Sequence, residues 1–217
     1  MYQTILKSLK DILSPKVLMF ILTIGVSSIA IWVIILIYFW DSFNHFVVSF
    51  LSWIPWEWAQ DTITYVAAPL AGYTLIIITV SILTSLFSDK LMISLAKKHY
   101  PAQEIVDNVS ITGSILVTIK SIIIFLILFM MLFPLIFIPI FGQVVLLYLW
   151  SILLKEPMIH DVGGLFISDK KELKKRRKKS TIIAMLASLF NYIPILNIFA
   201  PIFAQILFLH HILKEDK

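Results

Sequence analysis

The sequence predicts an all-α integral membrane protein, and three observations lead to this prediction. Hydrophobic residues make up 59% of the 217 positions, and charged residues make up only 14%, against roughly 25% in an average soluble domain. A soluble fold of this size cannot bury so much apolar surface, because its surface-to-volume ratio is too high. Long uncharged runs and the complete absence of Cys are the other two observations. Together they exclude a soluble enzyme, a disordered chain, a disulfide scaffold and thiolate chemistry.

Residues 1–15 are predicted to form an amphipathic helix that lies at the membrane surface. Apolar side chains recur at helical spacing, and polar side chains that include Lys7 and Asp11 occupy the other face. Ser14 and Pro15 are expected to end this helix before the first span.

Two transmembrane helices are predicted, over residues 17–40 and 62–88, because both runs carry no charge. The first run would extend about 36 Å as a helix, which exceeds a hydrocarbon core of about 30 Å. The connection 41–61 contains acidic residues and three tryptophans but no Lys or Arg. The positive-inside rule therefore places this connection outside and both termini in the cytoplasm.

The second half of the chain is predicted to form two re-entrant helical hairpins, over residues 115–154 and 181–213. Prolines interrupt both apolar runs, and each arm of the second run has only about 12 residues, or roughly 20 Å. Such arms are too short to cross a bilayer, so the segment must enter and leave on one side. Two ordinary pairs of spans would satisfy the charge rule equally well. Arm length favours hairpins firmly for the second segment and less so for the first.

A short internal repeat marks the two hairpin tips. Pro139-Ile140-Phe141-Gly142-Gln143 matches Pro201-Ile202-Phe203-Ala204-Gln205, in the same order and 62 positions apart. Broken helices of this kind expose backbone groups to substrates in transporters. Any membrane hairpin also needs prolines and small residues at its tip, and both interpretations stay open. The candidate pathway residues are Pro139, Gly142, Gln143, Pro194, Asn197, Pro201 and Gln205.

The basic linker 165–180 accounts for the net charge of the protein. Residues 170–179 hold eight basic residues and one acid, so the rest of the chain is slightly acidic. Beside a membrane, such a segment attracts anionic headgroups, at roughly 1 kcal/mol per basic residue. Interleaved aromatic residues are missing, so nucleic acid is not an expected partner. The residues expected to attract lipid or small anions are Lys174, Lys175, Arg176, Arg177, Lys178 and Lys179.

The histidines show no spacing typical of a metal site or of a catalytic group. His210 and His211 are adjacent, so they point to different sides of a helix and cannot chelate one ion together. We expect His99, His160, His210 and His211 to be loop and interface residues, with no metal, no cofactor and no enzymatic activity.

Three segments resemble the CysZ and etoposide-induced membrane-protein family. Residues 192–201 are similar to the family's "IPLLNL…P" signature, and 138–143, with Trp150 seven residues further on, resemble "IPxxGQ…W". Residues 166–179 resemble the family's basic cytosolic stretch. The resemblance implies two long transmembrane helices, two half-penetrating hairpins and a homo-oligomer in the bacterial inner membrane. It also implies uptake of sulfate.

The sequence departs from this family at the anion site that the resemblance implies. The family motif "PG[LI]RR" corresponds here to Pro15, Lys16, Val17, Leu18 and Met19. The proline is kept, whereas Leu18 and Met19 replace the two arginines. Ser14, Pro15 and Lys16 remain the candidate anion-binding residues, although Lys16 can equally serve as an anchor at the membrane interface.

Two functions follow for a single membrane domain of residues 1–217. The first is a CysZ-like inner-membrane transport protein for a small anion, with sulfate expected. The second is a non-transporting membrane scaffold of the same fold, which would bind a partner or anionic lipid through its basic linker.

Overall fold

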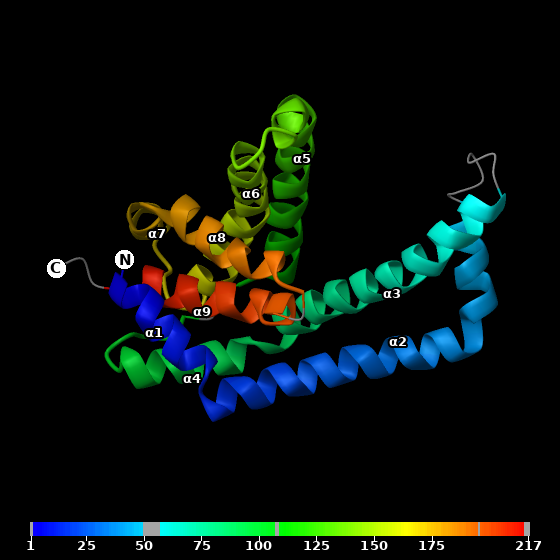
Figure 1. Cartoon of the computed structure of the whole chain (residues 1–217). Coiled ribbons are helices and arrows are strands. Elements are labelled where there is room, and N and C mark those ends of the chain that lie inside the picture. Colours follow the sequence, from blue (N-terminus) through cyan, green and yellow to red (C-terminus); the bar gives the residue numbers. More distant parts are fainter. Residues whose placement is uncertain (1, 50–56, 107–108, 195, 215–217) are drawn as a thin grey trace. The chain divides into compact units, whose positions relative to one another are not determined.

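The computed structural model describes residues 2–49, 57–106, 109–194 and 196–214, and every regular element in these residues is a helix (Figure 1). The predicted all-α fold is therefore confirmed. Trp53 and Trp56 of the predicted outer connection lie outside the described residues. The elements in chain order are α1 (Tyr2–Ile12), α2 (Pro15–Ser49), α3 (Glu57–Phe87), α4 (Asp89–His99), α5 (Ile111–Ile136), α6 (Phe141–Gly164), α7 (Lys170–Arg176), α8 (Ser180–Ser188), η1 (Leu189–Tyr192), η2 (Leu196–Ile198) and α9 (Ala200–Ile212).

The chain divides into two compact units. Unit 1 contains Met1–Leu18 and Ser85–Lys217, and unit 2 contains Met19–Thr84. Each unit is described by itself.

Unit 2 holds most of α2 and α3, the two helices predicted as spans. The α2 helix continues past its predicted end at residue 40, with a local non-helical backbone at Phe39 (φ −122°, ψ 20°). Pro69 lies inside α3, which already begins at Glu57. The indole N–H of Trp32 donates to Thr79 Oγ1 at 2.8 Å. Such a polar contact between two apolar helices has few competitors for its hydrogen bond in lipid.

Four helices in the described residues are long and apolar enough to cross a membrane. They comprise Pro15–Phe46, Thr64–Phe87, Ile111–Ile136 and Phe141–Gly164. Most apolar side chains of α2 and α5 are exposed, and only 6% of the apolar window in α5 is buried. Lipid is the solvent that such surfaces require.

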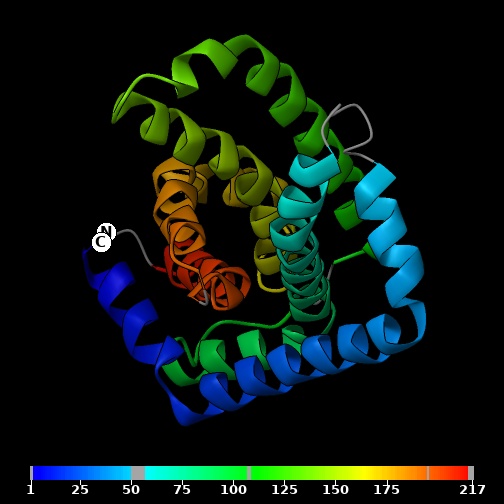
Figure 2. The same ribbon diagram turned by 45° about the vertical axis from the view of Figure 1, so that its right-hand side comes forward.

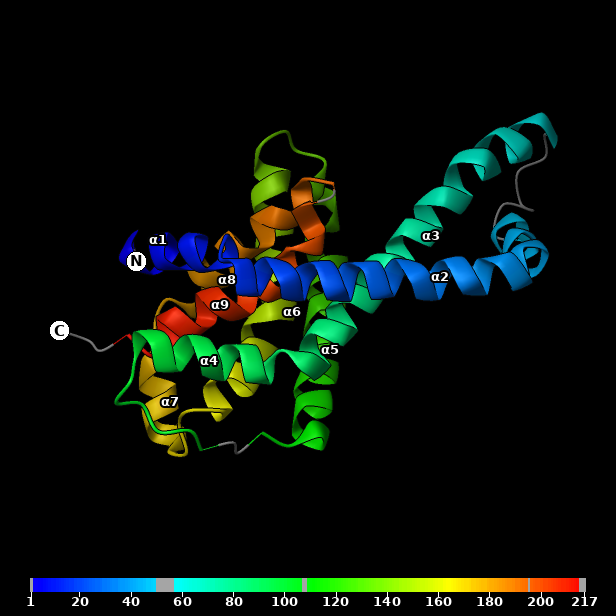
Figure 3. The same cartoon turned by 90° about the horizontal axis from the view of Figure 1, so that it is seen from below.

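The pair α5 and α6 is longer than the predicted hairpin 115–154. The two helices run side by side (Figures 1 and 3), with 26 residues in α5 and 24 in α6. The turn falls where the prolines predicted it. The difference in length arises because α5 begins at Ile111 and α6 continues through Lys155, Glu156 and Pro157 to Gly164.

The helices of the second predicted hairpin are short, as their spacing indicated. The α8 helix has 9 residues and α9 has 13. Every residue of α9 except Pro201 and His211 is buried. The neighbours of α9 include α1, α4, α6, α7, α8 and η2, and Figure 2 shows α6 and α8 beside it. A helix that is apolar on all sides belongs in such a central position.

Part of the polar face of α1 is turned toward protein. Thr4, Ser8 and Asp11 are buried on the side that packs against α9, whereas Lys7 and Lys10 are exposed. The apolar side chain of Tyr2 is 74% exposed. The predicted amphipathic helix is present, and some of its polar side chains make an internal contact.

The turn between α5 and α6 depends on a close backbone approach at Gly142. A Cβ atom at this position would lie 1.9 Å from the carbonyl oxygen of Ile136. Because this oxygen belongs to the backbone, no change of side-chain rotamer can relieve the clash. Ile140, two residues earlier, already has a positive φ of 65°, a strained conformation for a β-branched residue.

We expect Gly142→Ala to lower the thermal unfolding midpoint of the detergent-purified protein, because overpacking of this kind costs about 1–3 kcal/mol or more. Gly72→Ala is the matched control, since its nearest outside atom is Leu36 Cδ1 at 4.0 Å. Equal midpoints for the two variants would contradict the close approach.

Candidate functional site

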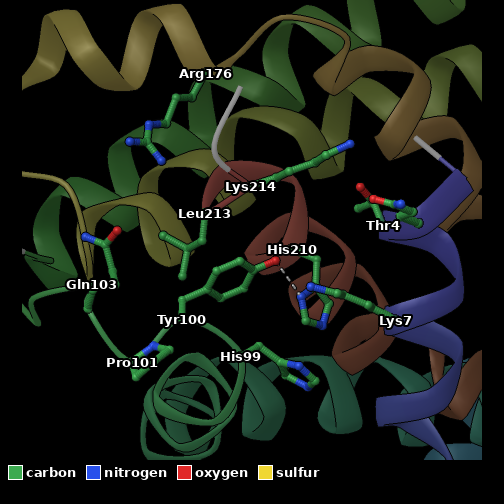
Figure 4. A pocket seen from close by; sticks show the side chains of 12 residues that line it. Thr4, Lys7, His99, Tyr100, Pro101, Gln103, Arg176, His210, Leu213 and Lys214 are labelled. Carbon is green, nitrogen blue, oxygen red and sulfur yellow. Dashed lines mark hydrogen bonds between the residues drawn. The ribbon is translucent and has the colours of Figure 1, made fainter. Parts of the chain in front are cut away.

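Unit 1 contains a pocket of about 650 Å³ where α1, the end of α4 and the end of α9 meet (Figure 4). Its wall combines residues from the two ends of the chain with the segment that follows α4. The lining residues are Gln3, Thr4, Lys7, His99, Tyr100, Pro101, Ala102, Gln103, Arg176, His210, Leu213 and Lys214.

The pocket wall carries three permanent positive charges. These charges come from Lys7 on α1, Arg176 at the end of α7 and Lys214 after α9. Within the described part of the chain, no Asp or Glu belongs to the lining. The pocket therefore offers a positive potential to a small anion.

The three basic side chains of the pocket wall differ in the contacts that they make with the rest of the protein. Arg176 donates from Nη1 to the carbonyl of Ile212 at 2.9 Å and from Nη2 to Glu172 at 2.5 Å, so it is partly engaged in fixing α7. Lys7 Nζ lies 5.2 Å from the centroid of the Tyr100 ring, which holds the ammonium group at the pocket wall. Lys214 is exposed.

A buried carboxylate lies behind the two histidines of the pocket. Asp11 Oδ2 is 2.8 Å from Nε2 of His99 and 2.8 Å from Nε2 of His210. Lys98 Nζ donates to Asp11 Oδ1 at 3.2 Å. The side chains of Asp11 and His210 are 2% and 0% exposed, so this contact joins α1, α4 and α9 out of solvent.

The pKa values determine the direction of these hydrogen bonds. Burial lowers the pKa of His210 to about 4, although the hydrogen bond with Asp11 acts in the opposite direction. The imidazole is therefore neutral at pH 7 and carries one N–H. Because the carboxylate can only accept, Nε2–H of His210 donates to Asp11, and Nδ1 accepts from the hydroxyl of Tyr100 at 3.1 Å.

This environment lowers the pKa of Asp11 and raises the pKa of Tyr100. Burial by itself would raise the pKa of the Asp11 carboxyl, but hydrogen bonds from His99, His210 and Lys98 outweigh it and hold that pKa below its usual range. Burial raises the pKa of Tyr100 to about 12, and the negative charge of Asp11 adds to this effect. Tyr100 is therefore a neutral donor at pH 7, and Asp11 is a carboxylate.

The predicted anion site at Ser14, Pro15 and Lys16 lies outside this pocket lining. Ser14 Oγ donates to the carbonyl of Asp11 at 2.6 Å, which closes the turn between α1 and α2, and Pro15 begins α2. Lys16 is exposed, and its Nζ donates to Ser94 Oγ on α4 at 2.5 Å. This serine contact ties the start of α2 to α4 within unit 1.

The two predicted hairpin tips meet through a tyrosine, but their glutamines differ. The Tyr192 hydroxyl donates to the backbone carbonyl of Gln143 at 3.0 Å, and the rings of Tyr192 and Trp150 are 5.0 Å apart. Gln143 is exposed, whereas Gln205 is 3% exposed and its Oε1 has no hydrogen-bond partner among the described residues.

The remaining tip residues occupy distinct places in the turns. Pro139 precedes α6, and Gly142 is buried in its first turn. Pro194 lies between η1 and η2, Asn197 lies in η2, and Pro201 is the second residue of α9.

The basic linker divides into anchored arginines and exposed lysines. Arg177 pairs with Glu156 on α6, and Arg176 pairs with Glu172 one turn earlier. Lys174, Lys175, Lys178 and Lys179 are exposed.

Sequence reasoning missed the contact of Asp11 with His99 and His210. The residues are 88 and 199 positions apart, so no local spacing reports the cluster. One signal was available: the predicted surface helix carries an acid, Asp11, on its polar face. If protein covers that face, the carboxylate must find hydrogen-bond donors.

We expect Tyr100→Phe to lower the thermal unfolding midpoint, because it leaves Nδ1 of the buried His210 without a donor. An unsatisfied buried acceptor costs about 1–3 kcal/mol. Tyr148→Phe, at an exposed tyrosine of α6, is the control and should change the midpoint little. The assignment fails if both variants unfold at the same temperature.

Comparison with known proteins identifies the family of the chain. The family model described as "Sulfate transporter CysZ/Etoposide-induced protein 2.4" matches residues 4–201, nearly the whole chain. No curated protein and no solved structure matches it. Lys7, Asp11 and His99 lie inside the matched range, and His210 lies beyond it. With four apolar helices of membrane-crossing length, the chain is a multi-pass membrane protein that belongs to the CysZ/etoposide-induced protein 2.4 family.

Proposed function

We propose that this protein transports a small inorganic oxyanion across the membrane, with sulfate as the first candidate. The observation that supports this most directly is the pocket with Lys7, Arg176 and Lys214 in its wall and no acid among its described lining residues. The family description names a sulfate transporter, and sulfate is a divalent anion of a size that such a pocket accommodates.

The pocket can supply both charge and hydrogen bonds to an oxyanion. A unit charge about 4 Å from another contributes about 4 kcal/mol near a protein surface, so Lys7 and Lys214 would attract the anion strongly at low salt. The Thr4 hydroxyl is a neutral donor in the same wall, whereas the single O–H of Tyr100 is donated to His210. A neutral donor orients an oxyanion without holding it too tightly to leave.

The membrane arrangement proposed for this function follows the charge pattern. We place the protein in a bacterial inner membrane, as a homo-oligomer surrounded by lipid, with both termini and the basic linker in the cytoplasm. The α8 and α9 helices would form a half-penetrating hairpin, because 13 residues extend only about 20 Å. The lysines of the linker would lie on anionic headgroups and raise the local anion concentration near the pocket.

The pocket lysines provide the direct test of transport. The double variant Lys7→Gln, Lys214→Gln should reduce sulfate uptake into proteoliposomes at least about tenfold, because two charge-assisted contacts are lost. Lys10→Gln is the matched control, since Lys10 is exposed on the same helix and does not line the pocket.

Lys16→Gln separates the two candidate anion sites. Loss of uptake in this variant alone, with the double variant unaffected, would move the anion to the start of α2. Absence of sulfate flux in the wild-type protein, under conditions where an established sulfate transporter is active, would overturn the proposed function. Retained binding to anionic vesicles would then favour the scaffold.

The absence of Cys allows the orientation to be tested with single cysteines. Asp41→Cys should react with an impermeant maleimide added outside intact cells, whereas Lys175→Cys should react only after the membrane is opened. Both positions are exposed. Outside labelling of Lys175→Cys would contradict a cytoplasmic linker.

A further inference from the structure

The Asp11 cluster has the composition and geometry of a metal-binding site. One carboxylate oxygen and one nitrogen from each of two imidazoles lie within 4.8 Å of one another. The three side chains come from α1, α4 and α9, and their positions are fixed by helices rather than by loops. We propose that Asp11, His99 and His210 bind one divalent transition-metal ion, with Zn²⁺ preferred.

The donor set determines the class of ion. Two imidazole nitrogens and one carboxylate oxygen suit Zn²⁺ and its transition-metal neighbours, whereas Ca²⁺ and Mg²⁺ require mainly oxygen ligands. Three protein ligands with a fourth position left open is the arrangement of many zinc sites that bind water or a further ligand.

Two of the three pairs of ligand atoms need only a small adjustment to accept the ion. Nε2 of His99 and Nε2 of His210 each lie 2.8 Å from Asp11 Oδ2. In a tetrahedral zinc site with bonds of about 2.0–2.1 Å, neighbouring ligand atoms are about 3.3 Å apart. Each imidazole nitrogen must therefore move about half an ångström away from Asp11 Oδ2, so that both atoms bind the ion instead of sharing a hydrogen bond.

The groups around the cluster can support the metal-bound state. When Nε2 of His210 binds the ion, its proton moves to Nδ1, and Nδ1–H then donates to the Tyr100 oxygen, which already lies 3.1 Å away. No proton is lost from the neutral imidazole. Lys98 stays on Asp11 Oδ1 at 3.2 Å. Such outer partners orient metal-bound histidines in known sites.

The proposed metal site lies beside the pocket. His99 and His210 both line the pocket, and their Nε2 atoms face Asp11, which is not among its lining residues. A fourth ligand of the ion would be water or an anion oxygen. The metal site itself does not depend on transport, because its three ligands are already in place without an anion.

Metal binding is tested on the full-length protein, purified in detergent through a histidine-free tag and stripped with a chelator. Titration with Zn²⁺ by calorimetry, and with Co²⁺ by its visible absorption, should reveal about one equivalent and a higher unfolding temperature. Mg²⁺ at the same concentration should give neither signal.

Substitutions of single histidines test whether the ion binds at the proposed ligands. His99→Gln should weaken Zn²⁺ binding by more than about tenfold. Since His99 is 20% exposed, this variant is the one best suited to retain the fold, which circular dichroism verifies. His160→Gln is the matched control, because His160 also lies beside an aspartate, Asp161, at 3.2 Å but has no second histidine among its described contacts. It should bind Zn²⁺ like the wild type.

Two results would overturn the metal site: a wild-type protein that binds no Zn²⁺, or a His99→Gln variant with unchanged affinity. The cluster would then be only a hydrogen-bonded clamp between helices. Sulfate uptake is measured separately through Lys7 and Lys214, so metal binding without uptake would reject the transport function alone. Uptake without metal binding would reject the metal site alone.

Discussion

A carboxylate that is almost completely removed from solvent is stable only where hydrogen-bond donors surround it, and Asp11 imposes this requirement on unit 1. Its partners come from α4 and α9, which are distant in the sequence. Loss of all of them would leave an uncompensated buried charge, which typically costs about 3–5 kcal/mol. The position of α1 against α9 and the wall of the pocket both follow from satisfying this one group.

The contact of Asp11 with α4 and α9 explains the orientation of the amphipathic helix α1. Thr4, Ser8 and Asp11 lie on one side of α1 and are buried, whereas large apolar side chains on the other side are exposed. In water this orientation would be unfavourable. Beside a bilayer it is favourable, because lipid accepts the apolar side and the protein interior satisfies the polar one.

The parts of the fold that the sequence predicts are those encoded by neighbouring residues. The break at Ser14 and Pro15, the turn before Gly142 and the short helices after Ser180 all appear where local composition placed them. The full lengths of α5 and α6 do not follow from hydropathy, because helix continues beyond the apolar run into Lys155 and Glu156. The pocket could not be predicted either, since it needs Lys7, Arg176 and Lys214 to converge through tertiary packing. The spacing between the histidines predicted no metal site. That spacing carries no information about Asp11, which lies far from them in the sequence.

The central place of α9 has a consequence for how the protein is made. Nearly all of its residues are buried, and it leaves the ribosome after α1 to α8. Until then α1 has no partner for its polar face, and Asp11 must remain hydrated at the membrane surface while the intervening helices insert. The pocket therefore cannot exist in a nascent chain that does not yet include α9. A chain interrupted before α9 would leave a membrane-inserted intermediate in which the buried side of α1 has no partner.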